Sequence, residues 1–209
     1  MRALEEVVSS GRVRFVGVSN FTGAMLAECM RTRRVDVSQV GYHMLDRRQE
    51  HETFPYCLQE GIGVMGYGSL GHGLLTGAFT AVTSFDAARD WRGHGVAFGQ
   101  PIFRGDNFRT NVAIAERIRR EIAQPRGVTL SQVALAWVLG HPAISTALVG
   151  ARTPAEVDAN HAGVDLELST AERGAIDALL AGAAGRVREF TPLLPAMQVW
   201  GEEIPAARV

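Results

Sequence analysis

Hydrophobic and polar residues follow a repeating pattern along the chain. Residues 2–10 place apolar side chains at helical spacing, and Gly11 follows as a stop signal. Residues 12–19 form a run of β-branched and aromatic residues that is typical of a strand. Thr22 can then cap a second helix whose apolar residues again share one stripe. The pattern predicts a helix, a strand and a helix in succession.

The same cycle repeats further along the chain. The remaining elements are expected as strands at 35–42, 62–69 and 144–150, and as helices at 51–60, 108–123, 130–140, from about 153 and from about 169. A loop rich in glycine and aromatic residues spans about 78–107. We expect one α/β domain over residues 1–184, followed by an irregular, proline-containing C-terminal tail over 185–209.

Strands that alternate with helices in this way imply a parallel sheet, because each crossover must return the chain to the same edge. In parallel α/β folds the loops at the carboxyl ends of the strands build the ligand site. Polar residues recur at this end of the predicted strands, at Ser19-Asn20, His43, Tyr67-Gly68-Ser69 and Gly150-Ala151-Arg152. The strands therefore stop on polar groups because their ends face a ligand.

The composition narrows the class of ligand. The 209 residues carry a net charge of -1, which gives no electrostatic reason to expect nucleic acid or an anionic membrane. The apolar runs are short, so we expect a cytoplasmic protein whose partner is a small molecule or a protein. Neither Cys29, Cys57 nor the histidines have the spacing of metal ligands. All 21 basic residues are Arg, so the chain contains no Lys.

Five stretches carry a family resemblance through their order and spacing: GRVRFVGVSNF, SQVGYHMLDRR, GIGVMGYGSLGHGLLTG, FRGDNF and VGARTPAEVDAN. Together they resemble the aldo-keto reductases, NADP-dependent carbonyl reductases built on a (β/α)8 barrel. The resemblance runs from about residue 2 to residue 182 and covers the motifs of barrel strands five to eight. It implies an α/β fold that is the C-terminal half of a TIM (β/α)8 barrel, with four parallel strands alternating with helices.

The resemblance also implies that the chain lacks the family's catalytic residues. In the family the catalytic Asp, Tyr, Lys and His belong to strands one to four, which have no counterpart here. Because the chain contains no Lys, a Lys that lowers the pKa of a proton-donating Tyr is not present. The expected site is therefore a cofactor site with no catalytic residue.

For the nicotinamide end of the cofactor, the resemblance implies three polar contacts and one aromatic contact. Ser19, Asn20 and Gln39 match the residues that bind the nicotinamide carboxamide, whose two donors and one acceptor suit hydroxyl and amide groups. Tyr67 matches the aromatic residue that stacks under the nicotinamide ring. From the residues alone, Asn20 could be a turn residue, Ser19 a local cap and Tyr67 part of the core.

The loop after Tyr67 corresponds to the pyrophosphate end. The resemblance implies cofactor contacts from Ser69, Leu70, Gly71 and Gly73. The family usually has Tyr-Ser-Pro-Leu where this chain has Tyr-Gly-Ser-Leu, so a hydroxyl is displaced by one position and a proline is lost. The glycines permit close backbone approach to phosphate oxygens, although they could also serve a turn.

The adenosine end matches Gly150, Arg152, Thr153, Glu156 and Asn160. A guanidinium donates two parallel hydrogen bonds to phosphate oxygens, so Arg152 can bind a 2′-phosphate beside the start of a helix. The expected cofactor is therefore NADP(H). Glu156 stands where the family often has Gln, so adenine recognition is only partly preserved. The alternative is that Arg152 is a solvated surface charge.

Three further features allow more than one interpretation. His43 ends its strand at the mouth of the site, where it could contact a ligand or be structural. The charged run at residues 46–50 is expected to be a solvated loop or the start of a helix. Arg104 and Asp106 could fold the long loop over the pyrophosphate or form a salt bridge within the loop.

Three hypotheses for function follow. The chain could represent an NADP(H)-dependent aldo-keto reductase through its cofactor-binding half, with Met1 an internal residue of a longer protein that reduces a small-molecule carbonyl. It could instead be a half-barrel that binds dinucleotide without chemistry, or a fragment that depends on a partner. Because four strands leave two unpaired edges, we also expect self-association into a dimer that closes a barrel-like ring, or else poor solubility.

Overall fold

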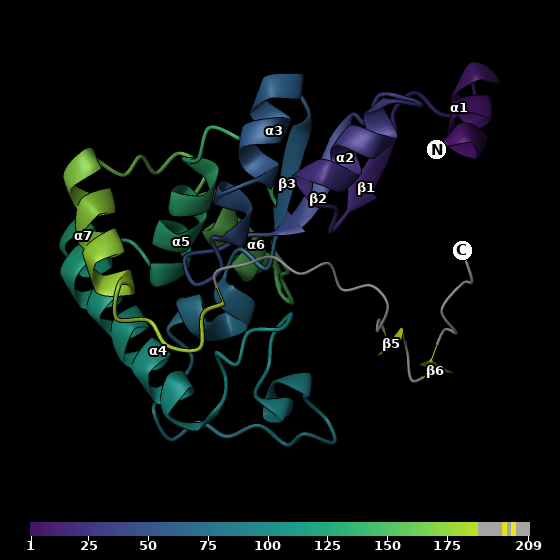
Figure 1. The fold of residues 1–209 in the computed structure, drawn as a ribbon. Coiled ribbons are helices and arrows are strands. Elements are labelled where there is room, and N and C mark those ends of the chain that lie inside the picture. The colour runs from purple at the N-terminus through teal and green to yellow at the C-terminus, as the bar shows by residue number, and fades with distance from the viewer. Residues whose placement is uncertain (188–197, 200–201, 204–209) are drawn as a thin grey trace.

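The computed structural model describes residues 1–187 and the backbone of residues 198–199 and 202–203. A parallel sheet lies at its centre with the strand order β1-β2-β3-β4 (Figure 1). The strands are β1 (Gly17–Ser19), β2 (Val37–Gly41), β3 (Gly63–Tyr67) and β4 (Ile144–Ala147). All three pairings between neighbouring strands are parallel, which confirms the α/β fold with four parallel strands.

Helices connect and cover the strands. The α-helices are α1 (Arg2–Ser9), α2 (Gly23–Met30), α3 (Thr53–Glu60), α4 (Gly105–Ile118), α5 (Leu130–Leu139), α6 (Pro154–His161) and α7 (Thr170–Leu180). Shorter helical turns are η1 (Arg48–Glu50), η2 (Gly71–Thr76), η3 (Trp91–His94), the π-helical η4 (Arg119–Ala123) and η5 (Gln124–Arg126). Thr22 caps α2 as predicted, since its hydroxyl accepts from the Met25 N–H, and Gly61 ends α3 in a left-handed conformation.

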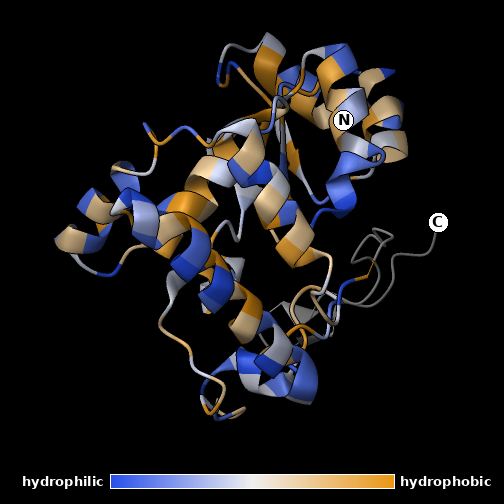
Figure 2. Cartoon of the chain, turned by 90° about the vertical axis from the view of Figure 1, so that its left-hand side faces the viewer, coloured by the Kyte–Doolittle hydropathy of each residue, from blue (hydrophilic) through white to orange (hydrophobic). Residues whose placement is uncertain are grey.

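The two faces of the sheet differ in burial. Ser38, Val40 and Val64 point to the helix-covered face and are buried, whereas Gln39 and Met65 on the other face are half-buried. Several helices carry hydrophobic residues on one side and hydrophilic residues on the other (Figure 2). The core therefore lies between the sheet and its helices, and the opposite face of the sheet is open.

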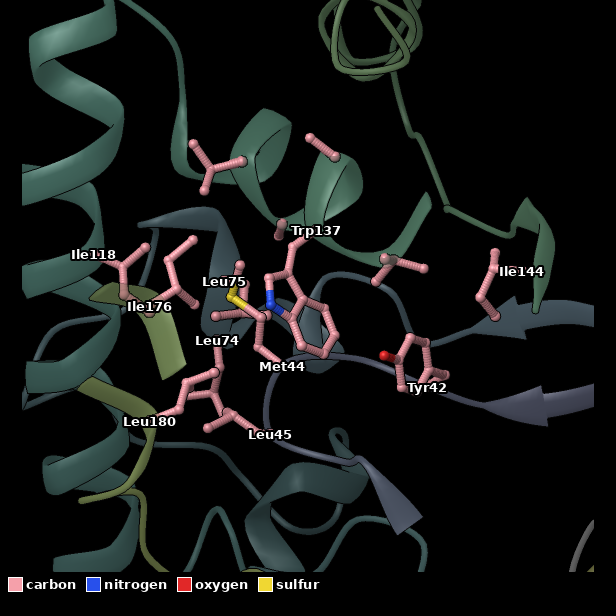
Figure 3. Close-up of a cluster of buried hydrophobic side chains, with 14 of the residues drawn as sticks. Tyr42, Met44, Leu45, Leu74, Leu75, Ile118, Trp137, Ile144, Ile176 and Leu180 are labelled. Atoms are coloured by element: carbon pink, nitrogen blue, oxygen red, sulfur yellow. The ribbon is translucent and has the colours of Figure 1, made fainter. Parts of the chain in front are cut away.

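The packed core supports the carboxyl end of the sheet. Tyr42 follows β2 directly, and its ring stacks on Trp137 of α5 with centroids 5.3 Å apart (Figure 3). Met44, Leu74 and Ile118 lie in the same cluster and are almost completely buried. The loops that leave β2 and β3 are thus fixed by apolar packing before they reach the site.

Two expectations from the sequence require correction. The strand predicted at 12–19 is only three residues long in the structure, as β1, because residues 12–15 lie exposed beyond the sheet edge. Of the two alternatives for the charged run at 46–50, the solvated loop is wrong and the start of a helix is confirmed, since Arg48–Glu50 form the helical turn η1 before α3. Asp46 and Arg48 are 4% and 8% exposed and form a buried ion pair with an N–O distance of 2.7 Å. Each carboxylate oxygen of Asp46 accepts from the Arg48 guanidinium, which explains how these charges are accommodated in the interior.

Most of the tail predicted at 185–209 lies outside the described residues. Within it the backbone of β5 (Gln198–Val199) pairs antiparallel with that of β6 (Glu202–Glu203). In the part of the chain that the structure describes, no helix is long and apolar enough to cross a membrane.

Candidate cofactor-binding site

The carboxyl ends of β1 and β2 bring three of the predicted residues together. Ser19 and Gln39 are register partners in neighbouring strands, and Met65 of β3 continues the same row. The Asn20 N–H then donates to the Gln39 carbonyl oxygen at 2.9 Å. Asn20 adopts φ 60°, a left-handed conformation that Asn tolerates better than most residues. The chain therefore turns sharply at Asn20 while its side chain stays beside the strand ends.

Tyr67 links this group to β3. Its hydroxyl donates to Asn20 Oδ1 at 2.9 Å, and its ring lies over the backbone of Gly41. A Cβ at Gly41 would stand 3.3 Å from the Tyr67 ring, so any larger residue there would require the ring to shift by a few tenths of an ångström. Burial raises the pKa of Tyr67 to about 12, which keeps the phenol protonated as a donor. An aromatic ring, an amide and a hydroxyl thus converge at this edge.

A cleft of about 760 Å³ continues from the end of β3 towards α6. The cleft is lined by seven of the residues predicted from the sequence: Ser69, Leu70, Gly73, Gly150, Arg152, Glu156 and Asn160. Gly71 is buried and Thr153 caps α6 by accepting from the Glu156 N–H, and neither residue lines the cleft. Segments about 80 residues apart in sequence therefore form one elongated cleft, as expected when parallel strands end at the same edge.

The Ser69 hydroxyl has a structural partner. Its oxygen lies 3.1 Å from the Gly66 carbonyl oxygen and 3.2 Å from that of Leu148, and the side chain is buried. Since a hydroxyl donates a single proton, these carbonyls share it. Ser69 therefore ties the ends of β3 and β4 together and fixes the width of the cleft at this point.

Arg152 and Glu156 face each other at the start of α6. The Arg152 side chain is 91% exposed, and its guanidinium lies 3.4 Å from Glu156 Oε1. The Arg152 N–H donates to Glu156 Oε2 at 2.7 Å, and this bond lowers the pKa of Glu156. A carboxylate of the chain itself thus occupies part of the helix start that was predicted to receive a phosphate.

Two residues at or beside the site were not anticipated. Arg92 lines the cleft, donates to the His72 carbonyl oxygen at 3.1 Å and is held by Asp90. Phe98 adopts φ 47° in a tight turn, and its ring lies 5.3 Å from the centroids of both Tyr67 and His72. Both Arg92 and Phe98 come from the loop at 78–107, where glycine and aromatic content gave no sign of which side chains would turn inwards.

The remaining polar candidates have structural surroundings. His43 is 1% exposed, and its Nδ1 accepts from the Leu45 N–H at 3.2 Å. Burial, aided by the neighbouring His72, lowers the pKa of His43 to about 3, so this imidazole is neutral. Asp106 pairs with Arg109 within the first turn of α4, and Arg104 precedes that helix. These contacts favour the structural interpretation of His43 and give Asp106 a helical partner.

Comparisons with known proteins agree with this geometry. A family model described as "Aldo/keto reductase family" matches residues 1–181. The chain belongs to the aldo/keto reductase family, whose members are oxidoreductases that bind nicotinamide dinucleotides.

Individual relatives match over about half of their own length. The chain is 31% identical over 169 residues to the NADH-specific methylglyoxal reductase of Escherichia coli (strain K12), which covers 81% of this chain and 49% of that protein. It is 28% identical over 179 residues to the versiconal hemiacetal acetate reductase of Aspergillus parasiticus, covering 82% and 50%. The glycerol dehydrogenase structure from Gluconobacter oxydans superposes with a TM-score of 0.79 at 28% identity, covering 90% of this chain and 55% of that one.

Proposed function

We propose that this chain is the cofactor-binding half of an NADP(H)-dependent oxidoreductase that interconverts carbonyls and alcohols. The observation that carries the proposal is that the Tyr67–Asn20 pair stands at the end of β3, directly before Gly68, where a cleft begins that extends to Arg152 and Asn160. At one end are the aromatic ring of Tyr67 and the amide of Asn20. At the other end are the guanidinium of Arg152 and the amide of Asn160. These groups match the two chemically different ends of a dinucleotide.

The residues present fit such a cofactor both at the strand ends and in the cleft. Tyr67 offers a ring for stacking, with Asn20 and Gln39 beside it for a carboxamide. Gly68 and Gly73 have positive φ and no side chain, so the backbone can lie close to phosphate oxygens, and Arg92 adds a positive charge. When bound, the cofactor would supply the hydride, while this chain would bind and orient it.

The preference for NADP(H) rests on Arg152. Its exposed guanidinium stands at the cleft wall, where a 2′-phosphate could accept two hydrogen bonds. Glu156 opposes this preference, since its carboxylate lies beside the same guanidinium. One relative, from Escherichia coli, is NADH-specific, so membership of the family does not by itself fix the choice. We therefore assign Arg152 as the residue that favours NADP(H) over NAD(H). The carboxylate of Glu156 reduces this preference.

The isolated chain is not expected to reduce carbonyls by itself. Carbonyl reduction needs a general acid, and Tyr42 and His43, which follow β2, are unsuitable. Tyr42 is 1% exposed and donates to Glu50, which together with burial raises its pKa, while His43 is buried and neutral. We infer that catalysis on a small carbonyl substrate in the cytoplasm requires the complementary half-barrel. A chain that binds dinucleotide without chemistry, or only with a partner, is the second candidate, favoured by its match to half of each relative.

Calorimetric titration of the 209-residue chain tests the proposal. NADPH, NADH and ADP-ribose should each bind at one site per chain, and nicotinamide mononucleotide more weakly, because most of the cleft faces the phosphate and adenosine groups. Asn160→Ala should weaken ADP-ribose binding, whereas Asn107→Ala, outside the cleft, should not. The absence of heat for all four ligands, on a chain that unfolds cooperatively, would contradict the proposal.

A further inference from the structure

Both outer strands of the sheet have an unpaired edge within the described residues. The strand order places β1 and β4 at opposite ends, each with one neighbour. Gly17 and Ser19 of β1 are exposed, as are Ser145 and Thr146 of β4. Open edges of this kind invite further strands, because their N–H and C=O groups otherwise face only water.

The β4 edge is bordered by an apolar groove of about 370 Å³. Leu135 and Leu139 of α5 form one wall, and Val157 of α6 with Val164 just beyond it form the other. Val157 and Val164 are 55% and 54% exposed, which is high for aliphatic side chains that lie together. The groove therefore offers apolar surface directly beside unpaired backbone groups.

The β1 edge carries apolar side chains that protrude from the molecule. Phe15 is 68% exposed, and Leu4 and Val13 are each 40% exposed. Helix α1 has no buried residue and projects from the molecule on the side of β1, opposite α4 and α7 (Figure 1). One edge thus presents protruding apolar groups, and the other presents a groove that could receive them.

Charge and strand direction agree with such a pairing. Arg12 and Arg14 stand next to the protruding apolar residues in sequence, while Asp158 and Asp165 adjoin the two valines of the groove, and all four are exposed. Because the four strands are parallel, a two-fold axis along the barrel direction places β1 of one copy beside β4 of the other in the same direction. The same operation joins the other pair of edges, so the sheet closes with eight strands.

We propose that two copies of this chain associate about that axis, with the β1 edge of each on the β4 edge and apolar groove of the other. Closure also brings the two open sheet faces together, so that half-buried side chains such as Val37 and Met65 gain an opposite wall. The association follows from the edges alone and does not require a bound cofactor.

Light scattering coupled to size-exclusion chromatography tests the assembly. At micromolar concentration the chain should elute at twice its mass of 22.6 kDa. Val164→Asp and Phe15→Asp should each shift the equilibrium towards monomer by at least tenfold in dissociation constant. Val82→Asp, a matched change at a valine that is 90% exposed in the long loop, should leave the dimer intact. A monomer throughout, or open-ended aggregates, would overturn the proposal.

Cross-linking tests which edges meet, with substitutions too small to prevent folding. In a Cys29→Ser background, Phe15→Cys and Val164→Cys chains should cross-link through a short bismaleimide only when the two are mixed. Efficient cross-linking of either chain with itself would show that like edges meet and would overturn the proposed arrangement. A dimer that persists in both the Val164→Asp and the Phe15→Asp variants would also overturn the proposed arrangement.

Discussion

The Tyr67 hydroxyl donates to Asn20 Oδ1 at 2.9 Å and so joins the ends of two strands that are not neighbours. The intervening strand ends at Gly41, and the Tyr67 ring passes over it. The polar groups at the end of β1 are therefore part of a cross-strand arrangement that fixes an aromatic ring. This arrangement gives the Asn20 side chain at the end of the first strand a physical role.

Tyr67→Phe should keep the ring and remove the bond to Asn20. We expect the free energy of unfolding to fall by roughly 0.5–1.5 kcal/mol, the usual cost of a lost hydrogen bond, in a urea titration. Gly41→Ala should instead displace the ring and weaken NADH binding more than ADP-ribose binding. Tyr56→Phe on α3 is the matched control, and an equal loss of stability there would remove any special role for the Asn20 bond.

Arg152→Ala should weaken NADPH binding far more than NADH binding, by roughly 1.5–3 kcal/mol if the guanidinium forms a charge-assisted contact with the 2′-phosphate. The measurement is calorimetric titration of both cofactors. Arg14→Ala removes another exposed guanidinium, outside the cleft, and should change neither affinity. Equal losses for NADPH and NADH in Arg152→Ala would rule out the pairing.

Glu156→Gln should have the opposite effect. The carboxylate lies beside the Arg152 guanidinium and accepts from the Arg152 N–H, so it repels a 2′-phosphate while the amide would not. Relative to NADH, affinity for NADPH should rise by roughly two- to fivefold, as expected for an exposed and solvent-screened charge. Asp158→Asn, two residues further along the same helix, should leave the ratio nearly unchanged. A fall in the ratio would show that Glu156 helps to bind the phosphate side.

The elements that sequence predicted well are those determined by local chemistry. Thr22 and Ser169 cap their helices because their hydroxyls accept from backbone N–H groups three residues on. The carboxyl ends of the strands were also predictable, since parallel connections place them at one edge. This information was sufficient to bring Ser69 and Gly150 to one cleft, whereas Asn160 of α6 was implied only by the family resemblance.

Other parts of the site depend on contacts between distant segments. The Arg48 guanidinium donates to the Phe98 carbonyl oxygen at 3.1 Å, across 50 residues, in addition to pairing with Asp46. Local spacing cannot reveal such a partner, so the charged run resembled a solvated loop. The left-handed backbone conformation of Phe98 could not be predicted from the sequence either. Aromatic residues rarely adopt this conformation, and tertiary contacts must enforce it.

The buried imidazoles predict a specific dependence of stability on pH. Burial lowers the pKa of His43 to about 3 and that of His72 to about 4, whereas both titrate near 6.5 when the chain unfolds. Between those values the unfolded chain binds protons that the folded chain does not. The free energy of unfolding should therefore be fully retained above pH 6.5 and fall as the pH drops towards 4, by up to about 1.4 kcal/mol per pH unit for each histidine.

His43→Asn separates this effect from the titration of carboxylates. The Asn side-chain oxygen can accept from the Leu45 N–H, as the His43 Nδ1 does, but it does not titrate. The slope of unfolding free energy between pH 4.5 and 6 should decrease relative to the unsubstituted chain. His94→Asn, at an exposed histidine in η3, should leave the slope unchanged. An unchanged slope in His43→Asn would mean that this imidazole is protonated in the folded chain.

Turnover by the purified 209-residue chain should be nearly absent even where the cofactor binds. A positioned general acid typically contributes 10²–10⁴-fold, and loss of alignment adds to the deficit. The chain contains no Lys to activate a tyrosine, Tyr42 is buried and bonded to Glu50 at 2.7 Å, and His43 is buried and neutral. NADPH and NADH oxidation should be followed at 340 nm with a panel of aldehydes. Robust oxidation that is abolished by Tyr42→Phe or His43→Asn, with folding retained, would identify a substitute acid and refute the dependence on a complementary half.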